Sequence, residues 1–136
     1  MNMFRPSTLL RRTLAVDAAT GAACGALMVL AQGPLADLLG LPAPLLHYAG
    51  LGLLPFAAAL LLMALGEALP RAAVWVVIAC NVGWVLGCLG LLVGSWASPT
   101  FLGQAFLVVQ IVVVLALTEL EFMGLRRSGT PSLAAA

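Results

Sequence analysis

The sequence predicts an all-α membrane protein whose four transmembrane helices form a bundle of two hairpins. Of the 136 residues, 63% are hydrophobic and only 8% are charged, whereas a soluble domain carries roughly 25% charged residues. Four apolar stretches are long enough to cross a hydrocarbon core of about 30 Å. We therefore expect the lipid bilayer to contact much of the surface. The net charge of +1 is too small for nucleic-acid binding.

The first span is expected over residues 13–32, after a short cytoplasmic segment of residues 1–12. Asp17 interrupts an apolar stretch that would otherwise suit a signal peptide, so we expect this span to be retained. At about 100° per residue, one face gathers most of the polar and small side chains: Thr13, Asp17, Thr20, Gly21, Cys24, Met28 and Gln32. This face should look into the bundle, and Gly21 and Gly25 on the same helix permit close helix packing.

The next connection, residues 33–45, is apolar and rich in proline. Its 34–41 part fits either a short helix in the outer membrane interface, with Asp37 facing water, or a plain loop. The second span is expected over residues 46–65. Pro55 inside it removes a backbone donor and predicts a kink, which could be purely structural or could serve gating or ligand access.

The third span is expected over residues 72–94 and carries two distinct faces. One face is a smooth stripe on which another helix, of this chain or of a second copy, could pack closely: Gly83, Gly87, Gly90 and Gly94. The other face holds Asn81, Trp84, Cys88 and Ser95. Asn81 lies near mid-membrane and needs a hydrogen-bond partner, either as an interhelical bond or as a contact to a ligand or ion.

The fourth span is expected over residues 101–123, which completes a transmembrane domain of residues 13–123. Glu119 and Glu121 lie about 200° apart on this helix, so they cannot share a face. Glu121 falls on a stripe with Gln110, and we expect it to point into the bundle. Glu119 should then reach toward lipid headgroups or an arginine. Residues 124–136 have the composition of a disordered cytoplasmic tail.

The arginines predict the orientation. All six basic residues are arginines, and with four spans they fall on one side of the membrane: Arg5, Arg11, Arg12, Arg71, Arg126 and Arg127. The connections on the other side contain no Arg or Lys. The positive-inside rule therefore predicts cytoplasmic N- and C-termini. We expect the protein to lie in a bacterial inner membrane. The absence of lysine and the abundance of Ala, Leu and Gly would suit a GC-rich genome.

The acidic residues of the first and fourth spans should lie in one layer. Counted from the flanking arginines, Asp17, Glu119 and Glu121 all fall roughly 7 to 10 Å into the membrane. In one interpretation these acids form ion pairs with the arginines that snorkel toward them: Arg11, Arg12, Arg126 and Arg127. In the other, Asp17 and a glutamate share a proton or hold a cation, because intramembrane acids are commonly functional.

In general layout the chain is similar to the small multidrug resistance family, short bacterial four-helix transporters with an acidic residue in the first helix. Asp17 carries this resemblance, which implies a small transporter. The residues that usually surround that acid in the family are absent here. The strong orientation bias, the proline-rich loop and the additional acids also depart from its pattern.

The sequence contains no combination of residues typical of an enzyme. It has no nucleophile–histidine pair, metal cluster or phosphate-binding loop, and its cysteines form no CxxC motif. We therefore expect no catalysis, metal or cofactor. The favoured interpretation is a non-enzymatic accessory or scaffolding protein that packs with itself or with a larger membrane partner. The alternative is a small proton- or cation-coupled transporter that uses Asp17 and Glu121.

Overall fold

The computed structural model describes residues 3–94 and 97–128. This part of the chain folds into β1 (Met3–Phe4), α1 (Thr8–Leu30), α2 (Gln32–Leu39), α3 (Ala43–Leu65), β2 (Leu69–Pro70), α4 (Arg71–Val93) and α5 (Phe101–Ser128). Four of these helices, α1, α3, α4 and α5, are long and apolar enough to cross a membrane. The predicted all-α, four-span fold is thereby confirmed. The β structure of the described residues is one short antiparallel pairing of β1 with β2.

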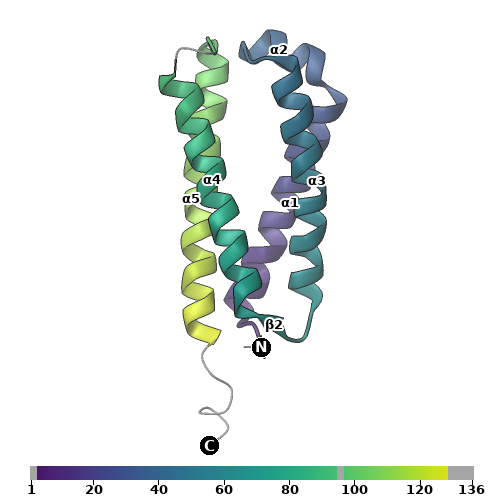
Figure 1. Ribbon diagram of the computed structural model, residues 1–136, viewed down its shortest axis with the longest axis vertical. Helices are drawn as coiled ribbons and strands as arrows, with labels where there is room; N and C mark the ends of the chain where they lie inside the picture. The colour runs from purple at the N-terminus through teal and green to yellow at the C-terminus, as the bar shows by residue number, and fades with distance from the viewer. Residues whose placement is uncertain (1–2, 95–96, 129–136) are drawn as a thin grey trace, which may run out of the picture.

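The long helices form two hairpins, α1 with α3 and α4 with α5 (Figure 1). Within the first hairpin the backbones meet at Gly25 and Gly50. A Cβ atom on Gly25 would lie 3.1 Å from the carbonyl oxygen of Gly50, and one on Gly50 would lie 2.9 Å from that of Gly25. Gly21 also faces α3, with the Cβ of Ala57 3.6 Å from its own ideal Cβ position. Small residues thus allow α1 and α3 to pack closely.

The start of α1 and the last turn of α5 lie at the same end of the bundle, which we call the arginine end (Figure 1). Here α1 begins at Thr8, earlier than expected, because the hydroxyl of Ser7 caps it by accepting from the amide of Leu10 at 3.2 Å. The same hydroxyl donates to the carbonyl of Gly124 at 2.9 Å. The backbone N–H of Ser7 donates to the hydroxyl of Ser128 at 2.9 Å. These bonds tie the start of α1 to the end of α5, which therefore runs beyond the expected residue 123.

A buried apolar cluster closes the arginine end. It brings together side chains from all four long helices, among them Leu14, Leu60, Val74 and Leu125. Arg11 covers the end of α3 by donating to the carbonyls of Ala64 and Gly66, each at 2.7 Å. Carbonyl groups that lack an intrahelical partner are thus satisfied by a cationic donor.

The opposite end of the bundle is joined by a contact between α2 and the start of α5. The connection 33–45 contains a true helix, α2, rather than a plain loop, and Asp37 on it is exposed. The backbone N–H of Thr100 donates to the carbonyl of Leu39 at 3.0 Å, and its hydroxyl donates to that of Leu38 at 2.7 Å. We call this contact the Thr100 junction. A second apolar cluster, which includes Leu107, packs beneath it.

The glycine stripe of α4 does not pack within the described part of the chain. Gly83 and Gly87 are exposed, and a Cβ atom added at Gly83, Gly87 or Gly90 would meet no heavy atom within 4 Å. Gly94 instead ends α4, with its N–H donating to the carbonyl of Gly90 at 2.8 Å. Helix α3 continues through Pro55 without interruption.

Candidate functional site

The most polar point inside the bundle joins Asp17 of α1, Asn81 of α4 and Glu121 of α5. The side-chain amide nitrogen of Asn81 donates to Asp17 Oδ2 at 3.2 Å and to Glu121 Oε1 at 2.7 Å. Because both bonds come from one nitrogen, the two carboxylate oxygens are at most 5.9 Å apart. We call these three residues the acid–amide cluster.

The acid–amide cluster is buried. The exposed fractions of Asp17, Asn81 and Glu121 are 6%, 5% and 0%. Asn81 lies ten residues after Arg71, hence about 15 Å along α4 from the arginine end. The second oxygen of Glu121, Oε2, has no hydrogen-bond partner among the described residues. Such an unsatisfied polar atom in a dry interior is costly unless a proton or an ion accompanies it.

Ion pairing with arginines, one of the two interpretations of the acidic layer, is wrong for this cluster. Arg11 bonds the carbonyls at the end of α3, and Arg126 lies over the ring of Phe122 at 5.8 Å. Within the described residues, neither these two arginines nor Arg12 and Arg127 forms an ion pair with Asp17 or Glu121. Asp17 and Glu121 are buried between the helices, whereas Arg11 and Arg126 have their partners at the end of α3 and on the ring of Phe122.

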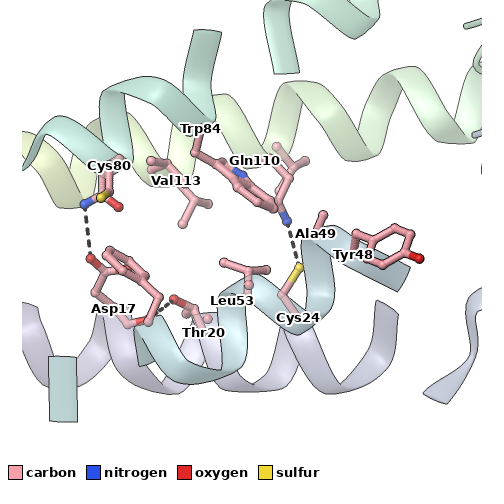
Figure 2. A pocket seen from close by; sticks show the side chains of 16 residues that line it. Asp17, Thr20, Cys24, Tyr48, Ala49, Leu53, Cys80, Trp84, Gln110 and Val113 are labelled. Carbon is pink, nitrogen blue, oxygen red and sulfur yellow. Dashed lines mark hydrogen bonds between the residues drawn. The ribbon is translucent and has the colours of Figure 1, made fainter. Parts of the chain in front are cut away.

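A cavity of about 390 Å³ adjoins the acid–amide cluster, between the two hairpins (Figure 2). Asp17 and Asn81 line it, whereas Glu121 lies behind them. Most of the remaining wall is apolar, contributed by α3 and α5 as well as α1 and α4. Asp17 is the only formally charged residue among those that line it. We call this space the polar cavity.

A second hydrogen-bonded group crosses the space between the hairpins. The indole N–H of Trp84 donates to Gln110 Oε1 at 3.0 Å, and Gln110 Nε2 donates to Cys24 Sγ at 3.4 Å. Figure 2 shows Asp17 at one end of the polar cavity and Cys24 with Gln110 toward the other end. Cys24 follows Asp17 by seven residues, so this bridge lies about 10 Å nearer the opposite end of the bundle.

Beyond this bridge lies a further cavity of about 340 Å³ with almost no polar wall, which we call the apolar cavity. Its lining includes Met28, Leu46, Leu91 and Leu107, which come from α1, α3, α4 and α5. Gly83 and Gly87 also line it, so part of the predicted glycine stripe borders this space. Ala49, Trp84 and Gln110 line both cavities, which therefore adjoin one another.

The two glutamates of α5 lie on different sides of the helix, as predicted from the stripe that Glu121 shares with Gln110. Glu121 is inside the bundle, whereas Glu119 is exposed and lies in a surface depression beside Thr118 and Phe122. The approach of Asp17 to Glu121 follows from the contact between α1 and α5. Sequence analysis missed the role of Asn81 as their shared donor. The position of Asn81 near mid-membrane indicated that it needs a hydrogen-bond partner. The pattern along one helix does not show which faces of three helices contact one another.

The arrangement can bind protons, cations or hydrogen-bond donors. Two buried carboxyl groups around one amide offer acceptor oxygens and negative charge in a setting of low dielectric. The described residues contain no group of three or more His, Cys, Asp or Glu side chains placed to hold a metal ion. No protein-family model, curated protein or solved structure matches the chain.

Proposed function

We propose that the protein is a small membrane transporter in which the acid–amide cluster carries a proton or another cation. The observation that carries this proposal is the position of the cluster: Asp17 and Glu121 share the amide of Asn81 at the wall of a cavity between two helical hairpins. Intramembrane acids that face a cavity mark ion or proton pathways.

The electrostatics of the cluster support this proposal. Two carboxylates within 5.9 Å of each other repel when both are ionised. Asn81 brings hydrogen-bond donors but no positive charge. In the described part of the chain, none of Arg11, Arg12, Arg126 and Arg127 pairs with either acid. A proton held between the two acids, or a cation beside Asp17, would remove much of this repulsion. In this proposal the acid–amide cluster exchanges a bound proton for a bound cation, and such an exchange is the elementary step of coupled transport.

The arrangement of the hairpins also supports a carrier. Each hairpin is joined within itself along its length, and the two hairpins enclose cavities between contacts at their two ends. Carriers commonly expose a central site to one side at a time by rocking one helix bundle against another. Following the positive-inside rule, we place the arginine end in the cytoplasm, in a bacterial inner membrane.

Proton and cation flux in liposomes tests this function. Purified protein is reconstituted, gradients of H⁺, Na⁺ and K⁺ are imposed in turn, and the internal ion concentration is followed with a trapped dye. We expect the wild type to dissipate at least one gradient faster than protein-free liposomes. Asp17→Asn and Glu121→Gln should each lose this activity, because each removes a carboxylate from the cluster.

Glu119→Gln is the matched control, since it makes the same chemical change on the same helix at an exposed position. It should keep the wild-type flux. Flux that persists in both Asp17→Asn and Glu121→Gln, or a wild type indistinguishable from empty liposomes for all three ions, would rule out the proposed transport.

The exposed glycine stripe favours a second candidate, a non-enzymatic accessory or scaffolding protein. Gly83, Gly87 and Gly90 have open space where side chains would stand, and small residues are typical of close helix contacts in membranes. A helix of a larger membrane protein, or of a second copy, could pack there. The acid–amide cluster would then serve to fix helix register within the subunit.

A further inference from the structure

The polar and apolar cavities together form one elongated site whose two ends differ in polarity. They adjoin at Ala49, Trp84 and Gln110, which line both. Asp17 and Asn81 stand at one end, and Met28 and Leu107 line the other. From Asp17 to Met28 the rise along α1 is about 16 Å. The site is therefore long and narrow, with its hydrogen-bonding groups gathered toward one end.

The negative charge at the polar end determines which charge a bound ligand can carry. Asp17 is the only charged residue among the described residues that line the two cavities, and the carboxyl group of Glu121 accepts a hydrogen bond from Asn81 beside it. The described residues of both walls include no arginine or lysine. A cationic group is therefore attracted and an anionic group repelled, most strongly where little water screens the charge. An ammonium group also supplies the donors that carboxylate oxygens accept.

The apolar end offers room for a flexible hydrocarbon chain. Its wall is almost entirely apolar, and Gly83 and Gly87 leave open space that side chains would otherwise occupy. Residues at the rim of the combined site, such as Gly87 on α4 and Val109 on α5, are exposed on the outside of the helices. The outside of a spanning helix is the lipid phase, so a molecule dissolved in the bilayer has a short route into the site.

We propose that the combined cavity binds a single-chain amphipathic amine. Its ammonium group contacts Asp17 and Asn81, and its alkyl chain runs past Trp84 and Gly87 toward Met28. This assignment names the solute class of the cavity, and it rests on the proposed function only for the claim that the bound amine is transported.

Tryptophan quenching in phosphatidylcholine vesicles tests the binding directly. Trp75→Phe with Trp96→Phe leaves Trp84, between the two cavities, as the single fluorescent reporter. A second protein with Trp84→Phe and Trp96→Phe keeps only Trp75, which is exposed on the outside of α4 and reports partition into lipid. The probes are decylamine, decanoate and decanol that carry bromine on the chain, so that they differ in head group alone.

We expect the brominated amine to quench Trp84 with a saturable dependence on concentration, and unbrominated decylamine to restore the fluorescence. Brominated decanoate should quench Trp84 no more than it quenches Trp75. Asp17→Asn should weaken the amine's apparent affinity about tenfold, as expected for the loss of a charge-assisted contact in a dry site. Gly87→Val should weaken it as well, by filling the path of the chain.

Gly90→Val is the matched control for Gly87→Val. Both glycines lie on α4 with open space around them, but only Gly87 lines the apolar cavity. Binding should survive in Gly90→Val. The head-group comparison needs no cavity variant, so it remains decisive even if a cavity variant fails to fold. Equal quenching by amine and decanoate, or amine quenching that is the same for Trp84 and Trp75, would overturn the assignment.

The two proposals fail in different ways. If ion flux depends on Asp17 but the amine does not bind selectively, the solute class is wrong and the transport proposal stands. If the amine binds selectively but no ion or amine crosses the membrane, the site is a binding site and the transport proposal is wrong.

Discussion

At the scale of single residues, Asn81 decides the character of the site. An asparagine near mid-membrane has two donors and one acceptor to satisfy, and here its nitrogen serves two acids on different helices. The three side chains thus form one network, in which the loss of any member leaves another without its partner. Through its one donor nitrogen, Asn81 on α4 links Asp17 on α1 to Glu121 on α5.

Asn81→Leu should therefore destabilise the protein in a way that depends on Glu121. We expect a double-mutant cycle of Asn81→Leu and Glu121→Met to give a coupling free energy of about 1 kcal/mol, the size typical of interhelical hydrogen bonds in membranes. Thermal unfolding in detergent provides the free energies. If the effects of the two substitutions simply add, Asn81 and Glu121 do not interact in the folded protein.

The residue scale also shows where sequence reasoning succeeds. The period of the α-helix separates Glu119 from Glu121, and the shared stripe with Gln110 points to the buried one. The hydrogen bonds of Gln110 to Trp84 and Cys24 were beyond prediction, because they depend on the rotation of α1, α4 and α5 about their axes. A single sequence predicts which residues share a face of each helix, but it does not predict which faces of neighbouring helices contact one another.

At the scale of elements, the Thr100 junction shows how a short helix closes one end of the bundle. Helix α2 ends at Leu39, and Gly40 follows with φ 68°, a left-handed conformation that suits glycine. This turn directs the carbonyl of Leu39 to the backbone of Thr100 at 3.0 Å. Helix α5 then passes so close that a Cβ atom on Gly103 would overlap the carbonyl oxygen of Leu39.

Gly103→Ala should consequently loosen the opposite end of the bundle. We expect a loss of roughly 1 to 3 kcal/mol in the free energy of unfolding, the range typical of overpacking at a close contact. The measurement is thermal unfolding in detergent. Gly33→Ala is the control, because Gly33 lies in α2 with no heavy atom within 4 Å of its Cβ position. Equal stability of the two variants would show that the close approach is absent.

Element boundaries were harder to predict than the elements. Hydropathy alone locates the four spans, since each contains about 20 apolar residues. It cannot show that Ser7 caps α1 or that α5 continues past residue 123, because these features involve bonds between the start of α1 and the last described turn of α5. The connection 33–45 was ambiguous for a related reason, as its prolines suit both a loop and the first turn of a helix.

At the scale of the whole molecule, neither the pairing of the helices into two hairpins nor the space between the hairpins follows from the lengths of the connections. Helices joined by short loops commonly pack as antiparallel neighbours. The short connection 66–70 is an exception, because it joins α3 to α4, which lie in different hairpins. The cavities lie between the two hairpins, beside the hydrogen bonds from Asn81 to Asp17 and from Gln110 to Cys24 that link them. Their shape depends on the sizes of many side chains together. The glycine stripe illustrates the limit, since its composition predicts close packing but Gly83 and Gly87 border an open space.

Native mass measurement separates the two candidate functions at this scale. The tagged protein is purified from its native membranes in mild detergent, and co-purifying proteins are identified by mass spectrometry. A transporter built from this fold should appear alone, as a monomer or a defined homo-oligomer. A larger protein in stoichiometric amount would instead favour the accessory role, with the glycine stripe as the first surface to substitute.

The bonds from Ser7 to Gly124 and Ser128 set a condition on how the protein is made. Helix α1 is synthesised long before α5, which supplies the partners of Ser7 at the start of α1. During that interval Asp17 stands in the membrane without Asn81 or Glu121, its partners in the finished protein. Through most of insertion, the nascent chain must therefore keep the side chain of Asp17 in the membrane before its hydrogen-bond partner has been synthesised. The packing of α1 against α3 at Gly25 and Gly50 is the first contact between spanning helices that can fix the position of α1 during this time.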